Sequence, residues 1–246
     1  YATGTVRGVG VRDASQDVLG VIHSDIDLAK EKIKLIMTQQ YNCGKTNHYF
    51  YPIEKREPIV SDRSDNHLWM VYTVYQIICE EGKTDVLNDE VEYYDGGKGT
   101  VFEHLEKSID YTLAHIGKDG IPLMLGSDWN DMLSNVCKKG KGESVFVSQM
   151  LVLACRNMKE ICEITGRDYS KYDKVIEEQT KILNDEFWDK DRYVRAVTDD
   201  GMKLGKNGDK CAEIWINSQS WAVMSGISGK EKGKIAMKTA VDKLDC

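Results

Sequence analysis

The sequence predicts an all-α fold with one short β-hairpin inserted in it. Apolar residues recur at helical spacing along most of the 246 residues, and only three prolines interrupt them. Long loops that combine Gly, Trp, Asp, Asn and Arg separate these helices, namely GVGVRDASQD, SDRSDNHLW and GSDWNDML. About seven helices with such loops fit a closed or half-closed toroid whose loops converge on a central pocket, although helical periodicity equally allows an irregular bundle.

The first three helices are indicated by apolar stripes and by capping residues. Ser24, with Asp27 three residues on, is expected to open the first helix, and Thr100 and Glu103 form a capping box before the third. The three stripes are Ile26, Ala29, Ile33, Ile36 and Met37; Leu68, Val71, Tyr72, Tyr75, Ile78 and Cys79; and Leu105, Ile109, Leu113 and Ile116.

Four more helices and the hairpin complete the pattern. The fifth helix runs from Ser170 to about Trp188, and two more lie near 218–227 and 228–244. A short strand near 192–197 turns at Asp199-Asp200-Gly201, and its partner is expected near 213–216. The fourth helix is long, with its stripe on Val147, Leu151, Ala154, Met158 and Ile161.

Composition excludes several classes of protein. The net charge of −7 argues against a nucleic-acid partner, because phosphate backbones require clustered Lys and Arg. No apolar run approaches the roughly 18 residues of a membrane span, and no signal peptide opens the chain. The seven cysteines include no CxxC pair, so we expect reduced, buried thiols in a cytoplasmic protein. Both ends look cut, so we expect part of a longer protein.

The sharpest segment is Gly126-Ser127-Asp128-Trp129-Asn130-Asp131. Two carboxylates, an amide and an indole in four residues make a poor core and a good sugar site, because sugars stack on Trp and bond to Asp and Asn. Glycosidic cleavage also needs a carboxylic acid to protonate the leaving oxygen. The alternative is a solvent-exposed turn, since Asp and Asn both favour turns.

The second segment runs from Arg7 to Asp17. It lacks the third glycine of a dinucleotide loop and the Lys-Ser/Thr of a P-loop, so a nucleotide site is excluded. Adjacent Arg12 and Asp13 suit bonding to vicinal hydroxyls, and the alternative is an internal Arg–Asp ion pair. We expect the 65–67 trio to cap a helix, with Trp69 in the core.

The sequence offers little support for a metal site or for a catalytic Ser or Cys nucleophile. His23, His104 and His115 lie in or beside helical stripes and are expected to be structural. His104 follows Glu103, but no third ligand stands out, so no metal site is predicted. No Gly-x-Ser-x-Gly elbow occurs, and no Cys or Ser comes with a convincing His partner.

Taken together in chain order, these segments resemble glycoside hydrolase family 94, the cellobiose-phosphorylase family. The matching stretches are GVRDASQD with LGVIH after it, DNHLW, FEHL, IPLMLGSDWNDML, GKGES and WINSQSWAVMSGI. They run from near Tyr1 to the last helix, and RDxxQD together with DWND is a specific combination.

The resemblance implies an architecture. Family members consist of an N-terminal β-sandwich, a linker, an (α/α)6 toroid and a small C-terminal sheet domain. Residues 1–246 would then be a single partial domain, roughly the first half of the toroid, with the β-sandwich and the C-terminal parts absent. Members are typically cytoplasmic homodimers, so a homodimer is expected for the full-length protein.

The resemblance also implies an activity and its residues. It implies inverting phosphorolysis of β-linked gluco-disaccharides or oligosaccharides to α-glucose 1-phosphate, with inorganic phosphate as co-substrate and no cofactor. Asp131 would be the general acid, with Asp128 as the runner-up, and Trp129 would line the reacting-sugar subsite. Arg12 and Asp13 would bind hydroxyls of the reacting glucosyl unit. Residues that hold phosphate would come largely from regions after this chain.

Two alternatives remain open at this level. An inverting hydrolase on the same toroid would need a second carboxylate about 6.5–9.5 Å from the acid, and Asp13 and Asp17 are candidates. A phosphorylase needs no such base, because phosphate is already a nucleophile. The other alternative is a catalytically inactive fragment that binds carbohydrate through Trp129.

Overall fold

The chain is divided into two compact units. The computed structural model describes residues 8–53 and 56–245, so Tyr1 and Cys246 lie outside the described residues. Unit 1 comprises 1–114 and 160–167, and unit 2 comprises 115–159 and 168–246. Each unit has its own core.

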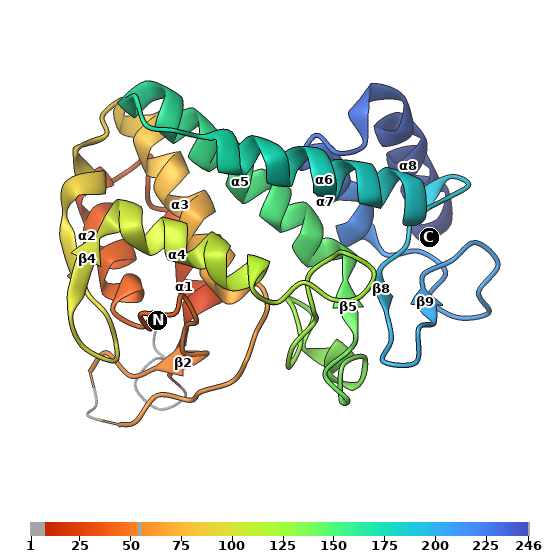
Figure 1. Ribbon diagram of the computed structural model, residues 1–246, viewed down its shortest axis with the longest axis horizontal. Coiled ribbons are helices and arrows are strands. Elements are labelled where there is room, and N and C mark those ends of the chain that lie inside the picture. The colour runs from red at the N-terminus through yellow and green to blue at the C-terminus, as the bar shows by residue number, and fades with distance from the viewer. Residues whose placement is uncertain (1–7, 54–55, 246) are drawn as a thin grey trace. The chain divides into compact units, whose positions relative to one another are not determined.

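Unit 1 is built on helices α1 (Val11–Leu19), α2 (Ile26–Met37), α3 (Asn66–Glu81) and α4 (Val101–Leu113). Helix α3 packs against each of the other three, and α1 also packs against α2 (Figure 1). The inward-facing apolar side chains of α2, α3 and α4, among them Ile33, Val74 and Ile109, are completely buried, which is why the stripes in the sequence have helical spacing.

Two short antiparallel ribbons accompany these helices. Strand β1 (Val9–Gly10) pairs with β2 (Tyr49–Phe50), which places the start of α1 beside residues 49–50. Strand β3 (Glu90–Glu92) pairs with β4 (Lys98–Thr100), and a 3₁₀ turn at Asp85–Asn88 precedes them.

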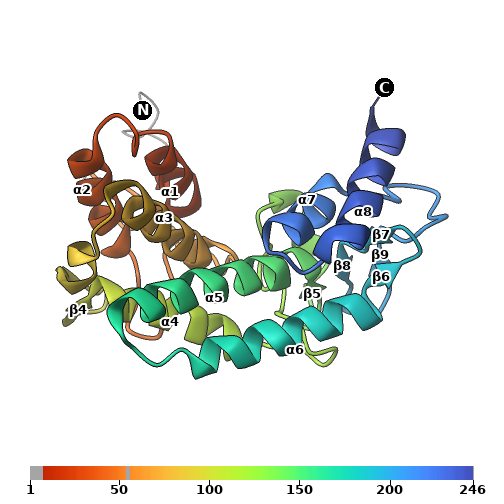
Figure 2. The ribbon, with the colours of Figure 1, turned by 90° about the horizontal axis from the view of Figure 1, so that it is seen from above.

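Unit 2 contains α5 (Val145–Thr165) up to Lys159, together with α6 (Ser170–Glu186), α7 (Ile216–Met224) and α8 (Gly229–Leu244). Helices α7 and α8 lie beside one another (Figure 2). The core of this unit gathers residues of α5, α6 and α7 with the strand region, and its most buried members include Val145, Val152, Leu183, Phe187, Tyr193 and Ala222.

Helices α5 and α6 run antiparallel in unit 2. Ser148 Oγ donates to Gln179 Oε1 at 2.6 Å near one end, and Lys159 Nζ lies 2.7 Å from Asp173 Oδ1 near the other. Residue numbers therefore rise along α5 as they fall along α6. Both polar contacts link positions on the facing sides of the helices, so they fix the register of the pair.

The strands of unit 2 form two small sheets near the start of α5. A three-stranded antiparallel sheet has the order β5 (Glu143–Ser144), β8 (Ala196–Val197) and β9 (Lys203–Leu204). Strands β6 (Trp188–Asp189) and β7 (Arg192–Tyr193) form a separate ribbon. The sheet thus connects residues 143–144 to a segment more than 50 positions later in the chain.

Most helix predictions are confirmed. The Thr100–Glu103 capping box is present in full, with each side chain bonded to the other residue's backbone N–H. The first predicted helix is instead capped by Asp25, whose carboxylate accepts the N–H of Leu28 at 3.0 Å. Ser24 donates to a backbone carbonyl of the preceding turn, so its hydroxyl does not cap the helix.

Two local predictions are wrong. The segment GVGVRDASQD is not a loop, because α1 begins at Val11. Its buried face carries Arg12 and Ser15 beside Val11 and Val18. Because two of these four residues are polar, the sequence lacks the continuous apolar stripe by which a helix is predicted. The strand at 196–197 pairs with 203–204 and not with 213–216, because the turn at 199–201 connects neighbouring strands directly.

The cysteines are only partly buried, which corrects the expectation of buried thiols. Cys137, Cys155 and Cys162 are buried, whereas Cys43, Cys79 and Cys211 are exposed. Cys79 lies in the last turn of α3, at the exposed end of the apolar stripe predicted for this helix.

The all-α class with small sheets is confirmed at the level of a mainly helical fold, and the (α/α)6 arrangement stays a prediction. None of the helices within residues 8–53 and 56–245 has the length and apolar character that a membrane span requires.

Candidate active site

The 126–131 loop is fixed at both ends in unit 2. Leu125, just before it, has a φ of 54°, a left-handed conformation that is uncommon for residues other than glycine. At the other end, Asn130 caps the 3₁₀ helix Asp131–Asn135, and its Oδ1 accepts the N–H of Met132 at 3.1 Å. A strained backbone at one end and a cap at the other are consistent with a loop that must present specific side chains.

Asp128 anchors the middle of this loop. Its side chain is completely buried and accepts hydrogen bonds on both oxygens. Oδ1 accepts from the N–H of Asn130 at 2.9 Å and from Nη2 of Arg195 at 2.6 Å, and Oδ2 accepts from Oγ of Ser144 at 2.7 Å. Three donors, one of them a guanidinium, hold the two oxygens in place, which suits an anchor of the loop.

The other prominent side chains of the loop face solvent. Trp129 is 42% exposed, and Asp131 is exposed at the first position of the 3₁₀ helix. Ser127 is buried, and its Oγ lies 3.2 Å from the backbone oxygen of Asp128 and 3.5 Å from Oδ1 of Asp131. The loop therefore buries Ser127 and Asp128 and presents an indole and a carboxylate together.

Arg195 is a residue that the sequence pattern missed. It lies just before β8, and its backbone N–H donates to Leu204 at 2.7 Å. Its guanidinium is 1% exposed and lies over the rings of Phe146 and Trp215, at 5.4 and 5.8 Å from their centroids. No sequence signal links it to Asp128, because 67 positions separate the two.

The neighbouring 139–142 turn is held by Asp199. The carboxylate accepts the backbone N–H groups of Lys139, Lys141 and Gly142 at 2.7, 2.8 and 3.0 Å. Burial acts to raise the pKa of Asp199, but the three donors outweigh it and hold the pKa below its usual range. An ionised Asp199 thus ties this lysine-rich turn to the strand region.

Glu143 is a second buried carboxyl group near the loop. Its side chain is completely buried, and Oε1 accepts the N–H of Asp119 at 3.1 Å. Oε2 has no hydrogen-bond partner among the described residues. Burial raises the pKa of Glu143 above its usual range. Gly117 packs so closely that a Cβ there would lie 2.4 Å from the carboxyl group, so no substrate can reach it from that side.

Arg12 and Asp13 lie in the first turn of α1, in unit 1. Arg12 is buried, and its Nη1 lies 3.4 Å from Oδ2 of Asp65, 53 positions away. Asp13 is exposed, with one carboxylate oxygen lying close to Gly10, where an added Cβ would meet it at 2.1 Å. Arg12 thus pairs with Asp65, which lies 53 positions away, and substrate binding by Arg12 or Asp13 stays a prediction.

The predicted capping role of the 65–67 trio is wrong. Asp65 occupies the N-cap of α3, but its side chain makes no capping hydrogen bond. Its carboxylate is completely buried between Arg12 and the indole N–H of Trp69, which donates to Oδ2 at 3.0 Å. Trp69 is 6% exposed, so its predicted place in the core is confirmed.

The candidate residues thus form two sets. Asp128, Trp129 and Asp131 belong to one loop of unit 2, whereas Arg12 and Asp13 belong to one helical turn of unit 1. Within each set, one member (Asp128 or Arg12) is buried in an ion pair and the other candidate residues are exposed.

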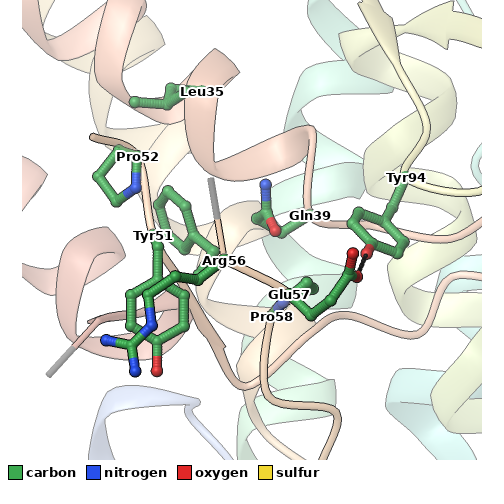
Figure 3. A pocket seen from close by; sticks show the side chains of 9 residues that line it. Leu35, Gln39, Tyr51, Pro52, Arg56, Glu57, Pro58 and Tyr94 are labelled. Atoms are coloured by element: carbon green, nitrogen blue, oxygen red, sulfur yellow. Dashed lines mark hydrogen bonds between the residues drawn. The ribbon is translucent and has the colours of Figure 1, made fainter. Parts of the chain in front are cut away.

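A cavity of about 320 Å³ lies elsewhere in unit 1 (Figure 3). None of the residues predicted from the sequence lines it. Its polar side chains already contact one another: Tyr94 donates to Glu57 at 3.4 Å, and Arg56 lies 4.8 Å from the ring centroid of Tyr51. We therefore assign no ligand to it.

Within the part of the chain that the structure describes, no group of three or more His, Cys, Asp or Glu side chains is arranged to hold a metal ion. His104 is buried with Nδ1 2.6 Å from Oε1 of Gln40 and Nε2 3.1 Å from the carbonyl of Val91. Burial lowers the pKa of His104, and protein oxygens occupy both ring nitrogens, which agrees with a structural role.

Comparison with known proteins identifies the family. The chain is 34% identical to solabiose phosphorylase from Paenibacillus borealis over 98% of its length, and 28% identical to N,N'-diacetylchitobiose phosphorylase from Vibrio proteolyticus over 96%. It covers 31% and 32% of these two relatives, or about a third of their length.

A solved structure shows the fold alone. The rhamnosidase from Klebsiella oxytoca with rhamnose bound matches 96% of this chain and 42% of its own, with a TM-score of 0.61 and 11% identity.

The family model of the glycosyl hydrolase 94 superfamily catalytic domain matches residues 1–246. The chain therefore belongs to the glycosyl hydrolase 94 superfamily, within its catalytic domain.

Proposed function

We propose that the full-length protein containing this chain is an inverting phosphorylase that cleaves β-linked gluco-disaccharides or oligosaccharides and releases α-glucose 1-phosphate. Family membership and relatives that are named as phosphorylases support the reaction with phosphate. The observation that carries the residue assignment is the 126–131 loop, which buries Asp128 in an ion pair and exposes Trp129 and Asp131.

Asp131 is the proton donor in this proposal. It is the carboxyl group of the loop that solvent and substrate can reach, whereas both oxygens of Asp128 are occupied by donors. Asp131 gives its proton to the glycosidic oxygen while phosphate attacks C1 from the opposite face, which inverts the anomeric centre. One protein carboxylate suffices, because phosphate replaces the water and the base of an inverting hydrolase.

Trp129 and the first turn of α1 bind the sugar in this proposal. The exposed indole offers a face on which the C–H side of a pyranose can stack. Asp13 presents an exposed carboxylate for hydroxyl groups, and Arg12 holds the turn against Asp65. Cytoplasmic location and a homodimeric full-length protein stay predictions.

The test is phosphate-dependent release of glucose 1-phosphate from a panel of β-linked disaccharides by the full-length protein. Asp131→Asn should lower kcat by about 10²–10⁴-fold, the usual contribution of a general acid. The matched control is Asp185→Asn, the same change at an exposed position of α6, which should leave kcat unchanged.

Each outcome decides between the open alternatives. Release that requires phosphate and is lost in Asp131→Asn supports the proposal, and the best substrate identifies the linkage. Equal cleavage without phosphate shows a hydrolase, with Asp13 and Asp17 as the candidates for its base. A folded protein that cleaves nothing but binds sugar through Trp129 shows the inactive binding fragment.

A further inference from the structure

The contact between Arg195 and Asp128 is a closely spaced buried ion pair in unit 2. Nη2 of Arg195 lies 2.6 Å from Oδ1 of Asp128, and the two side chains are 1% and 0% exposed. The carboxylate belongs to the 126–131 loop and the guanidinium to the strand region. The pair therefore ties the loop to a rigid element of the same unit.

The same carboxylate oxygen reaches the backbone beside the proposed acid. Oδ1 of Asp128 also accepts the N–H of Asn130 at 2.9 Å, and Asn130 immediately precedes Asp131. The position of the carboxylate therefore sets the path of the chain from Asp128 to Asp131. A shift of Asp128 would move the acid without removing it.

Arg195 is held in place from several sides. Its guanidinium lies over two aromatic rings, and Nη1 lies 3.4 Å from Oγ of Ser144. Ser144 Oγ donates to Oδ2 of Asp128 and accepts the N–H of Val147 at 3.1 Å in the first turn of α5. The planar guanidinium thus reaches Asp128 and Ser144 at once, which a lysine ammonium on a flexible stem does not reproduce.

We propose that Arg195 is a positioning residue for the reaction: acting through Asp128, it fixes the 126–131 loop so that Asp131 reaches the glycosidic oxygen. This inference rests on the proposed function, because it takes Asp131 as the proton donor. Because the side chain of Arg195 is 1% exposed, it acts through Asp128 in this proposal, and its effect must appear in the step that Asp131 performs.

The test uses two substrates that differ in their need for an acid. One is the best disaccharide of the panel, whose alkoxide leaving group requires protonation. The other is the 2,4-dinitrophenyl β-glycoside of the same non-reducing sugar, whose leaving group departs without a proton. In full-length Arg195→Lys, kcat on the disaccharide should fall by about tenfold to a hundredfold with KM within about twofold. On the aryl glycoside the loss should shrink to less than about threefold.

A second variant covers the case in which the single change fails to fold. The double variant Arg195→Gln and Asp128→Asn buries no uncompensated charge and should show the same selective loss on the disaccharide. The matched control is Arg192→Lys, a change at another completely buried arginine of unit 2 that pairs with Asp191, away from the loop. It should leave the ratio of the two substrates unchanged.

The outcomes separate this inference from the proposed function. Equal losses on both substrates, an equal shift of the ratio in Arg192→Lys, or full disaccharide activity in folded Arg195 variants would overturn the positioning role. If the wild-type protein cleaves without phosphate, the phosphorylase proposal fails. The comparison of the two leaving groups then still decides the role of Arg195, because a hydrolase needs the same acid.

Discussion

Replacement of Asp65 by alanine removes the carboxylate that faces Arg12 at the start of α1. The two side chains are 0% and 6% exposed, and their nearest atoms are 3.4 Å apart. At that distance and an effective dielectric constant of about 20, the gross attraction is about 5 kcal/mol. Desolvation offsets much of that gain when the pair forms, but loss of one partner leaves the other charge buried.

We therefore expect Asp65→Ala to lower the free energy of unfolding of unit 1 by about 3–5 kcal/mol. Loss of the acceptor for the indole N–H of Trp69 acts in the same direction. Asp65→Asn retains an acceptor for Trp69 and should cost less than the alanine variant. The difference between the two variants separates the contribution of the charge to the free energy of unfolding from that of the hydrogen bond to Trp69.

The assay is hydrogen exchange of the full-length protein, followed by mass spectrometry, on peptides from α1 and α3. Local readout is needed because a chain of several units does not unfold as one transition. The control is Asp185→Ala on α6, which breaks an exposed pair with Lys181 and should cost only about 0.3–0.5 kcal/mol. A loss in Asp65→Ala as small as that of the control would refute the assignment of a buried, energetically coupled pair.

Two further predictions concern unit 2. Because burial raises the pKa of Glu143 in the folded protein, the stability that its protonated form contributes is full below the unfolded pKa of about 4.3 and is lost as pH rises toward the folded pKa. Glu143→Gln should therefore gain stability relative to wild type across that window, measured by hydrogen exchange of peptides from β5 and α5 with both proteins compared at each pH. A difference that does not vary with pH would contradict this. Trp129→Ala should raise KM for the disaccharide by about tenfold or more with little change in the hydrogen exchange of unit 2 peptides, because the indole is 42% exposed and is proposed to stack on the sugar. An unchanged KM would exclude Trp129 from the subsite.

The helices of this protein could be predicted because their signals are local. The stripe of α5 repeats every three to four residues, and its apolar members are the ones that the structure buries. The Thr100–Glu103 box needs only three residues of separation, and it forms as the sequence indicates. The 126–131 loop was also evident, because its residue types suit neither a core nor a scaffold turn.

Helix α1 escaped prediction for a physical reason. Its buried face contains Arg12 and Ser15, so the sequence lacks the apolar stripe that marks a helix. The guanidinium is tolerated there because Asp65, from the start of α3, lies against it. A pattern that counts apolar residues cannot anticipate a buried charge whose partner is 53 positions away.

The sequence by itself determined the helical class, the positions of most helices, and the loop that carries Trp129 and Asp131. Only the tertiary structure decided which carboxylates of the motifs are anchors and which are exposed. Asp128 and Asp131 are three residues apart, yet one is buried against Arg195 and the other faces solvent. Helical periodicity and motif spacing depend on neighbours along the chain, whereas the fate of a charged side chain depends on a partner that folding brings from far away.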